Sequence, residues 1–336
     1  MDAAAFRPPN AYTAISPEIE QYLNSLPPYA GSNPLGDESR KNTDTQYFIN
    51  IPMRDGFQSE TRIHKPPTSS SSPSPVIVLI FGGGFHTGEC TQLSPYARVV
   101  SKLYNATVVN ISYRVAPDYR FPTAPNDVWD GLKWVAENAH TLGADLSAGF
   151  IVGGPSSGGN LAAVVAQRAL DENLSPALTG VWTFMPLLLE PEIVPAKYQD
   201  VFFSREQNAD VPGLNKTALE NLMAGYAPDI KSSDFSPFNS SSAFKGMPPT
   251  FVQVCGLDVV RDDALIYERA LREHGVKTKL AVYPGAPHGH ITFPNLKSAA
   301  KAQFDLVEGF GWLLGKPVSE EQLKNVLATA SFVAED

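Results

Sequence analysis

Residues 154–158 read Gly-Pro-Ser-Ser-Gly, which fits the pattern G-x-S-x-G with Ser156 at its centre. An apolar run, 150–152, comes directly before this pattern, and a helix-forming run, 161–165, follows it. A turn from a strand into a helix at this point is tight, so it needs glycines at its flanks and lifts the central side chain above the strand end. The spacing predicts that Ser156 is a nucleophile. The alternative is a glycine-rich helix N-cap without chemistry.

A serine hydroxyl is a weak nucleophile near neutral pH and needs a base to take its proton. The chain has six histidines, and two of them, His288 and His290, lie in a loop after the last predicted strand, 277–283. Because they are two residues apart, they cannot easily both face one serine. The spacing alone leaves both of them as candidates for the base.

An acid must orient that base, and three aspartates compete for the role. Asp258 directly follows the predicted strand 250–255, whereas Asp262 and Asp263 fall in the first turn of a predicted helix, 261–274. Carboxylates are common in a first turn because they interact favourably with the helix dipole. The position at a strand end therefore favours Asp258. Serine, acid and histidine then follow one another in the chain order of an α/β-hydrolase.

A glycine run, 82–84, could supply the donors for a negatively charged intermediate. It follows a continuous apolar run, 75–81, and glycines let backbone N–H groups approach a substrate oxygen closely. The alternative is a plain glycine-rich turn. Ser157, at the start of its helix, should supply a further N–H. We also assign three side chains to the substrate pocket, although a structural role fits His86 equally well: Phe85, His86 and His290.

Strands and helices alternate along the chain, which predicts the α/β class with a mostly parallel sheet covered by helices on both faces. The predicted strands are 45–53, 60–64, 75–81, 106–113, one beginning at 150, 181–185, 250–255 and 277–283. The predicted helices are 17–26, 127–139, 157–171, 261–274 and 297–314, followed by a short helix that a capping box at 319–322 opens.

The interval between the sixth and seventh strands has helical stretches but no strong strand signal. We therefore predict an inserted helical cap at 187–245 within a core made of 41–186 and 246–336. Residues 1–40 are rich in proline and polar residues and are predicted to form an N-terminal arm that contributes to the cap.

The composition describes a globular protein and excludes several classes of partner. The chain has 336 residues, 43% of them hydrophobic, and a net charge of −9 without a long basic run, which argues against nucleic acid and anionic membranes as partners. No apolar run approaches the ~20 residues of a membrane span, and no secretory signal is apparent, so we expect a cytoplasmic location. Two cysteines are too few for a disulfide framework. The oligomeric state, a homodimer included, stays open.

Several segments resemble the hormone-sensitive-lipase-like branch of the α/β-hydrolases, over roughly residues 45–315. Residues 111–117 (Ile-Ser-Tyr-Arg-Val-Ala-Pro) with Asp127 are similar to one motif of this branch, and Asp-Val-Val-Arg-Asp from Asp258 is similar to another. Pro-His-Gly around His288 resembles a third motif and therefore selects His288 over His290. The resemblance implies that Ser156, Asp258 and His288 form a catalytic triad.

The glycine run resembles the H-G-G-G motif of the same branch, and this implies that Gly83 and Gly84 are oxyanion donors together with Ser157. The chain departs from the family pattern at four positions. Phe81 replaces the histidine that orders the glycine loop, and Pro155 replaces an acidic residue before the serine. Ser157 and His290 replace an apolar residue and a phenylalanine.

These observations predict a carboxylic ester hydrolase that acts on a small-molecule acyl substrate through an acyl-enzyme, without a metal or an organic cofactor. The resemblance also admits lactone or thioester hydrolysis, acyl transfer and elimination at the same site. A non-catalytic ligand-binding module is the third hypothesis.

Overall fold

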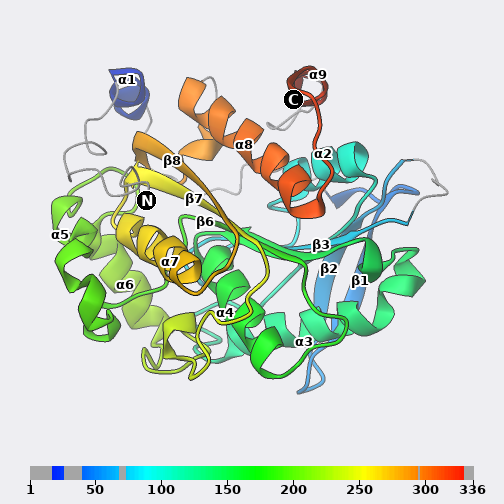
Figure 1. Cartoon of the computed structure of the whole chain (residues 1–336), viewed down its shortest axis with the longest axis horizontal. Coiled ribbons are helices and arrows are strands. Elements are labelled where there is room, and N and C mark those ends of the chain that lie inside the picture. Colours follow the sequence, from blue (N-terminus) through cyan, green and yellow to red (C-terminus); the bar gives the residue numbers. More distant parts are fainter. Residues whose placement is uncertain (1–16, 26–39, 68–72, 294–295, 329–336) are drawn as a thin grey trace.

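The computed structural model describes residues 17–25, 40–67, 73–293 and 296–328. In this part of the chain, eight strands form one sheet in the order β1-β2-β4-β3-β5-β6-β7-β8 (Figure 1). β2 is antiparallel to both of its neighbours, and every other neighbouring pair is parallel. The strands are β1 Gln46–Pro52, β2 Gln58–His64, β3 Val76–Ile80, β4 Thr107–Ile111, β5 Phe150–Pro155, β6 Gly180–Phe184, β7 Thr250–Leu257 and β8 Thr278–Pro287.

Helices cover both faces of this sheet, because its central strands carry apolar side chains on both sides and are buried at every position. One face carries α2 Ser94–Tyr104, α8 Lys297–Leu314 and α9 Glu320–Ala328. The other carries α3 Thr123–Asn138, α4 Ser157–Asp171 and α7 Arg261–Glu273 (Figure 1). The predicted α/β class with a mostly parallel sheet is confirmed; α2 was not predicted from the sequence.

The N-terminal helix α1 Pro17–Ser25 agrees with the predicted helix and lies beside α8. Ile19 is buried, and the Glu18 carboxylate accepts a hydrogen bond from the Lys297 N–H at 2.9 Å. The rest of the predicted arm up to residue 39 lies outside the described residues.

The segment between β6 and β7 folds into short helices: η6 Pro191–Ile193, η7 Ala196–Val201, α5 Ser204–Gln207, α6 Lys216–Tyr226 and η8 Pro237–Asn239. Two aspartates at the start of α7 bind the first part of this segment. Asp263 accepts hydrogen bonds from the N–H groups of Leu188 and Leu189, both at 2.9 Å. Asp262 accepts hydrogen bonds from Phe203 and Ser204 at 2.8 and 2.6 Å. The segment is therefore fastened to the carboxyl edge of the sheet.

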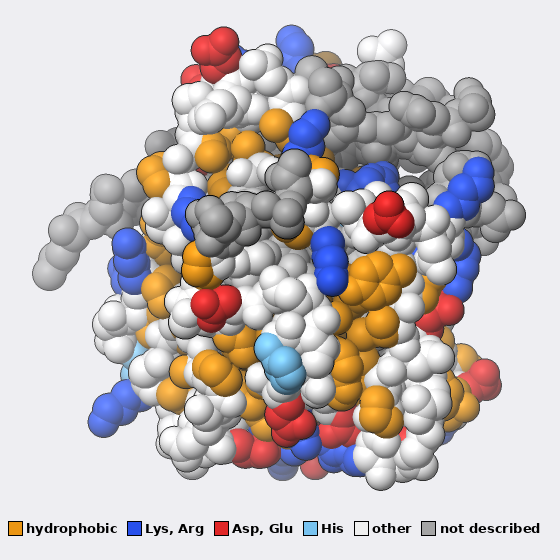
Figure 2. Space-filling view, turned by 90° about the vertical axis from the view of Figure 1, so that its right-hand side faces the viewer, with side chains coloured by type: hydrophobic (Ala, Val, Ile, Leu, Met, Phe, Trp, Pro, Cys, Tyr) orange, Lys and Arg blue, Asp and Glu red, His pale blue; other side chains and the backbone are white. Residues whose placement is uncertain are grey.

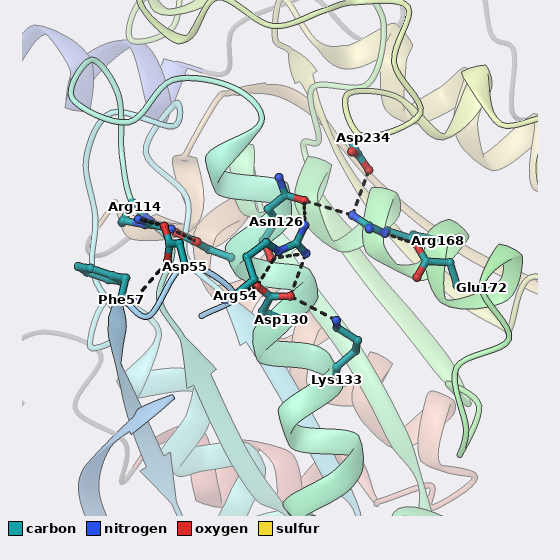
Figure 3. Close-up of polar contacts among 11 residues, drawn as sticks. Arg54, Asp55, Phe57, Arg114, Asn126, Asp130, Lys133, Arg168, Glu172 and Asp234 are labelled. Atoms are coloured by element: carbon teal, nitrogen blue, oxygen red, sulfur yellow. Dashed lines mark hydrogen bonds and ion pairs between the residues drawn. The ribbon is translucent and has the colours of Figure 1, made fainter. Parts of the chain in front are cut away.

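An ion-pair network connects the β1–β2 turn, the loop after β4, α3 and α4 (Figure 3). Arg114 binds Asp127 through two hydrogen bonds of 2.9 and 2.7 Å and also pairs with Asp55. The Asp127 side chain is 2% exposed and that of Arg114 12%. Arg54 pairs with Asp130 on the same helix, α3. The network fixes the hairpin against the helices that support the sheet.

We expect Asp127→Asn to lower the free energy of unfolding by about 2–3 kcal/mol, because it leaves a largely buried guanidinium with one partner fewer. Urea unfolding monitored by fluorescence measures this change. Glu172→Gln is the matched control, since Glu172 pairs with Arg168 while 49% exposed and should cost under about 0.5 kcal/mol. Equal losses in the two variants would contradict the expectation.

Figure 2 shows the face that β1 and β2 occupy in Figure 1. Hydrophobic side chains lie there among Lys, Arg, Asp and Glu side chains of both signs. The coloured part of this face therefore has no continuous basic patch of the kind that binds nucleic-acid phosphates. Among the residues that the structure describes, no helix combines the length and apolar character of a membrane span.

Candidate active site

Ser156 lies in the turn between β5 and α4, as the motif predicts. Its backbone has φ 54° and ψ −123°, a conformation that residues other than glycine rarely adopt. The flanking glycines are required by close approach: a Cβ at Gly154 or Gly158 would lie 2.4 or 2.2 Å from the Ile80 carbonyl oxygen of β3. Packing against β3 therefore holds this strained turn in place.

A chain of hydrogen bonds connects Ser156 to a histidine and an aspartate. His288 Nε2 lies 2.9 Å from Ser156 Oγ, and His288 Nδ1 lies 2.7 Å from Asp258 Oδ2. Asp258 is fully buried after β7, and its second oxygen accepts a hydrogen bond from the Val260 N–H at 3.0 Å. The carboxylate can only accept, so it holds the proton of His288 on Nδ1. Nε2 is then free to take the serine proton.

The competing candidates lie elsewhere. Asp262 and Asp263 bind the backbone of the segment between β6 and β7. The His290 ring is fully buried, with Nδ1 3.3 Å from Cys255 Sγ, and it packs edge-on against Phe184. The ring thus packs among core side chains, and the assignment of His290 to the substrate pocket stays a prediction.

The glycine loop lies beside the serine turn. A Cβ at Gly82 would be 3.3 Å from Ser156 Cβ, and Gly83 and Gly84 have φ values of 129° and 62°. The N–H groups of Gly83 and Gly84 donate to no residue that the structure describes. Ser157 is the first residue of α4, where an N–H has no acceptor within the helix. The role of these three N–H groups as oxyanion donors stays a prediction.

Helix α6 packs directly on this loop. A Cβ at Gly84 would lie 2.7 Å from the Leu222 side chain of α6, and a Cβ at Gly225 of α6 would lie 2.3 Å from His86 Nε2. The Phe85 ring stacks on Tyr226 at 4.0 Å and is 1% exposed. The Phe85 and His86 rings thus lie between the loop and α6. Their contact with substrate stays a prediction.

Two residues that the sequence did not single out support the loop. Tyr113 stacks on Phe81 at 4.1 Å, and its hydroxyl lies 3.2 Å from the Phe81 carbonyl oxygen and 3.1 Å from Ser157 Oγ. Gln92 binds both backbone polar groups of Gly82. Tyr113 belongs to a motif that the sequence showed, whereas no pattern pointed to Gln92.

The carboxyl group of Glu190, which follows β6, lies where its charged form is unfavourable. Its Oε1 is buried without a hydrogen-bond partner among the described residues. Burial raises the pKa of Glu190 to about 7; the positive charge of Arg205 lowers it, and the nearby carboxylates of Asp263, Glu192 and Glu220 raise it further. A carboxyl whose pKa is raised on folding stabilises the native state below its unfolded value, and this contribution is lost as the pH rises through the folded value.

We therefore expect Glu190→Gln to stabilise the protein at pH 8.5 by about 1–2 kcal/mol, a figure reduced for the partial exposure of the side chain. The gain should vanish near pH 5, where the native carboxyl is already protonated. Urea unfolding of both proteins at the two pH values measures it. Glu192→Gln, at an exposed position two residues on, is the control. A gain for Glu190→Gln that is the same at both pH values would contradict this account.

The fold and the site define the class of the protein, the α/β-hydrolases. The sequence pattern of a protein family with the alpha/beta hydrolase fold matches residues 77–292, so the chain belongs to this family. Its resemblance to the hormone-sensitive-lipase-like branch is confirmed.

Individual relatives match most of the chain. An AB hydrolase superfamily protein of Schizosaccharomyces pombe is 30% identical over 330 residues, which cover 92% of this chain and 97% of that protein. Carboxylesterase NlhH of Mycobacterium tuberculosis is 33% identical over 244 residues, 71% and 73% of the two chains. The crystal structure of vibralactone cyclase has a TM-score of 0.81 and 28% identity, and covers 91% of this chain and 96% of that one. The chain is thus similar to esterases over most of its length.

Proposed function

We propose that this chain is a serine hydrolase that cleaves carboxylic esters through an acyl-enzyme. The observation that carries the proposal is the hydrogen-bonded series from Asp258 through His288 to Ser156. Beside it, the N–H groups of Gly83, Gly84 and Ser157 have no acceptor among the described residues. The similarity to a carboxylesterase supports the same reaction.

In the proposed mechanism, Ser156 Oγ attacks the acyl carbon while His288 Nε2 takes its proton. Asp258 stabilises the imidazolium that forms. The N–H groups of Gly83, Gly84 and Ser157 hold the oxyanion of the tetrahedral intermediate. His288 then protonates the leaving alcohol. A water molecule, deprotonated by the same histidine, releases the acyl group.

We also propose that 187–245 and the N-terminal arm form the cap over this site. The contacts of Leu222 and Tyr226 with the glycine loop support the part of the cap that contains α6. A cap of this kind would limit the space around a small-molecule substrate and determine which acyl groups enter.

The test combines turnover with covalent labelling. The purified protein should hydrolyse p-nitrophenyl acetate or butyrate, and a fluorophosphonate should stop turnover and add its mass to the peptide that contains Ser156. Absence of both turnover and labelling would overturn the proposal. Labelling with very slow turnover of every simple ester would favour the second candidate.

That second candidate is acyl transfer to a hydroxyl of the substrate itself, which forms a lactone. The likeness over 91% of the chain to vibralactone cyclase favours this reaction over thioester hydrolysis and elimination. Ester hydrolysis and lactone formation share the acyl-enzyme and differ only in whether water or a substrate hydroxyl attacks it. A hydroxy-ester substrate that yields lactone in excess over hydroxy acid would identify this reaction.

A further inference from the structure

The glycine loop needs contacts that fix its conformation, because glycine loses more conformational freedom on folding than any other residue. The residue that opens the loop, Phe81, carries no polar side-chain atom, and its ring is occupied by stacking on Tyr113. Its carbonyl is held by the Tyr113 hydroxyl at 3.2 Å. The next peptide groups, which lead into the oxyanion donors, require a different partner.

Gln92 supplies that partner. Its Oε1 accepts a hydrogen bond from the Gly82 N–H at 2.9 Å, and its Nε2 donates to the Gly82 carbonyl at 3.2 Å. A primary amide can pair in this way in one orientation only, since an N–H donates and a carbonyl accepts. Gln92 lies in the turn before α2, where its own N–H binds the Glu89 carbonyl at 3.0 Å. One side chain therefore fixes both polar groups of a single glycine.

Gly82 is the point at which the loop touches the serine turn. A Cβ there would lie 2.9 Å from the Pro155 carbonyl oxygen and 3.3 Å from Ser156 Cβ. The Gly82 carbonyl belongs to the same peptide plane as the Gly83 N–H. Holding that carbonyl therefore fixes the direction in which the Gly83 N–H points.

We propose that Gln92 is a positioning residue of the oxyanion hole, which acts through the Gly82–Gly83 peptide and does not touch substrate. This inference rests on the proposed ester hydrolysis. Oxyanion donors act mainly on the transition state, so a misdirected N–H lowers kcat more than it changes KM.

The main variant is Gln92→Met, which keeps the length of the side chain and removes both hydrogen bonds. We expect kcat for p-nitrophenyl butyrate to fall about 10- to 100-fold with KM within about twofold. The affinity for a trifluoromethyl ketone, whose adduct carries an oxyanion, should fall by a similar factor. Gln58→Met is the matched control, because Gln58 also donates to a glycine carbonyl, that of Gly56, but in the exposed β1–β2 turn. It should leave kcat unchanged.

Gln92→Glu adds a readout that loss of packing would not produce. A protonated carboxyl can donate and accept as the amide does, whereas the carboxylate cannot donate to the Gly82 carbonyl. The ratio of kcat in this variant to kcat in the wild type should therefore drop about fivefold or more from pH 5 to pH 8. This ratio tests the positioning role of Gln92 even where Gln92→Met does not fold.

The outcomes separate the two proposals. A wild type that neither turns over esters nor reacts with fluorophosphonate overturns the proposed function and this inference with it. An active wild type whose Gln92→Met variant keeps kcat within twofold, or whose Gln92→Glu ratio is flat with pH, overturns the role of Gln92 alone. A fall in kcat in Gln58→Met as large as in Gln92→Met also overturns it.

Discussion

Ser156→Ala is expected to lower kcat for a short p-nitrophenyl ester by about 10³-fold or more, because the residual site lacks the atom that bonds to the acyl carbon. The hydroxyl removed is the one 2.9 Å from His288 Nε2. The strained turn depends on glycine packing against β3, which the variant retains, so the fold should persist. Steady-state kinetics and the unfolding midpoint measure the two effects separately.

Ser157→Ala is the matched control, since it removes a neighbouring hydroxyl that is buried. Ser157 Oγ lies 3.1 Å from the Tyr113 hydroxyl and not beside the histidine, while its backbone N–H is unaffected by the change. We expect kcat to stay within about tenfold of the wild type. Near-normal turnover by Ser156→Ala, or a larger loss in Ser157→Ala, would contradict the assignment of the nucleophile.

Asp258→Asn is expected to lower kcat by about 10³- to 10⁴-fold with little change in stability. An amide can still accept the hydrogen bond from Val260. Its NH₂ group, however, would donate to Nδ1 and so favour the tautomer of His288 that carries its proton on Nε2. That nitrogen could then no longer take the serine proton. Kinetics of the folded variant, checked by circular dichroism, test this.

The neighbouring aspartates provide the control for Asp258. Asp262→Asn and Asp263→Asn weaken backbone contacts of the segment between β6 and β7, so they should lower the free energy of unfolding by about 1–3 kcal/mol. The folded fraction should keep kcat within about tenfold. Loss of turnover in a folded Asp263→Asn variant, together with an active Asp258→Asn variant, would show that the acid had been misassigned.

The sequence predicted the elements whose pattern is local. Buried parallel strands appear as continuous apolar runs, and the bounds of α4 and α8 agree with the predicted helices. The capping box is confirmed by its two reciprocal hydrogen bonds, of 2.9 and 3.2 Å between Ser319 and Gln322. Each of these signals involves residues only a few positions apart, so it is visible without a fold.

What the sequence missed about the site depends on contacts between distant segments. Gln92 meets Gly82 only because the chain folds back before α2, and a single glutamine has no pattern that announces this. The contact of His290 with Cys255 was equally hidden, because the two residues lie far apart in the sequence. The helix α2 was missed because Pro95, although well tolerated in a first helical turn, is also typical of a break between elements.

The packing of α6 on the glycine loop has a thermodynamic consequence. Leu222, Gly225 and Tyr226 pack against the loop from one side, so the proposed oxyanion donors and α6 are expected to be ordered together. Any ligand that binds better to the ordered loop must, by linkage, also stabilise the docked helix, and by the same amount.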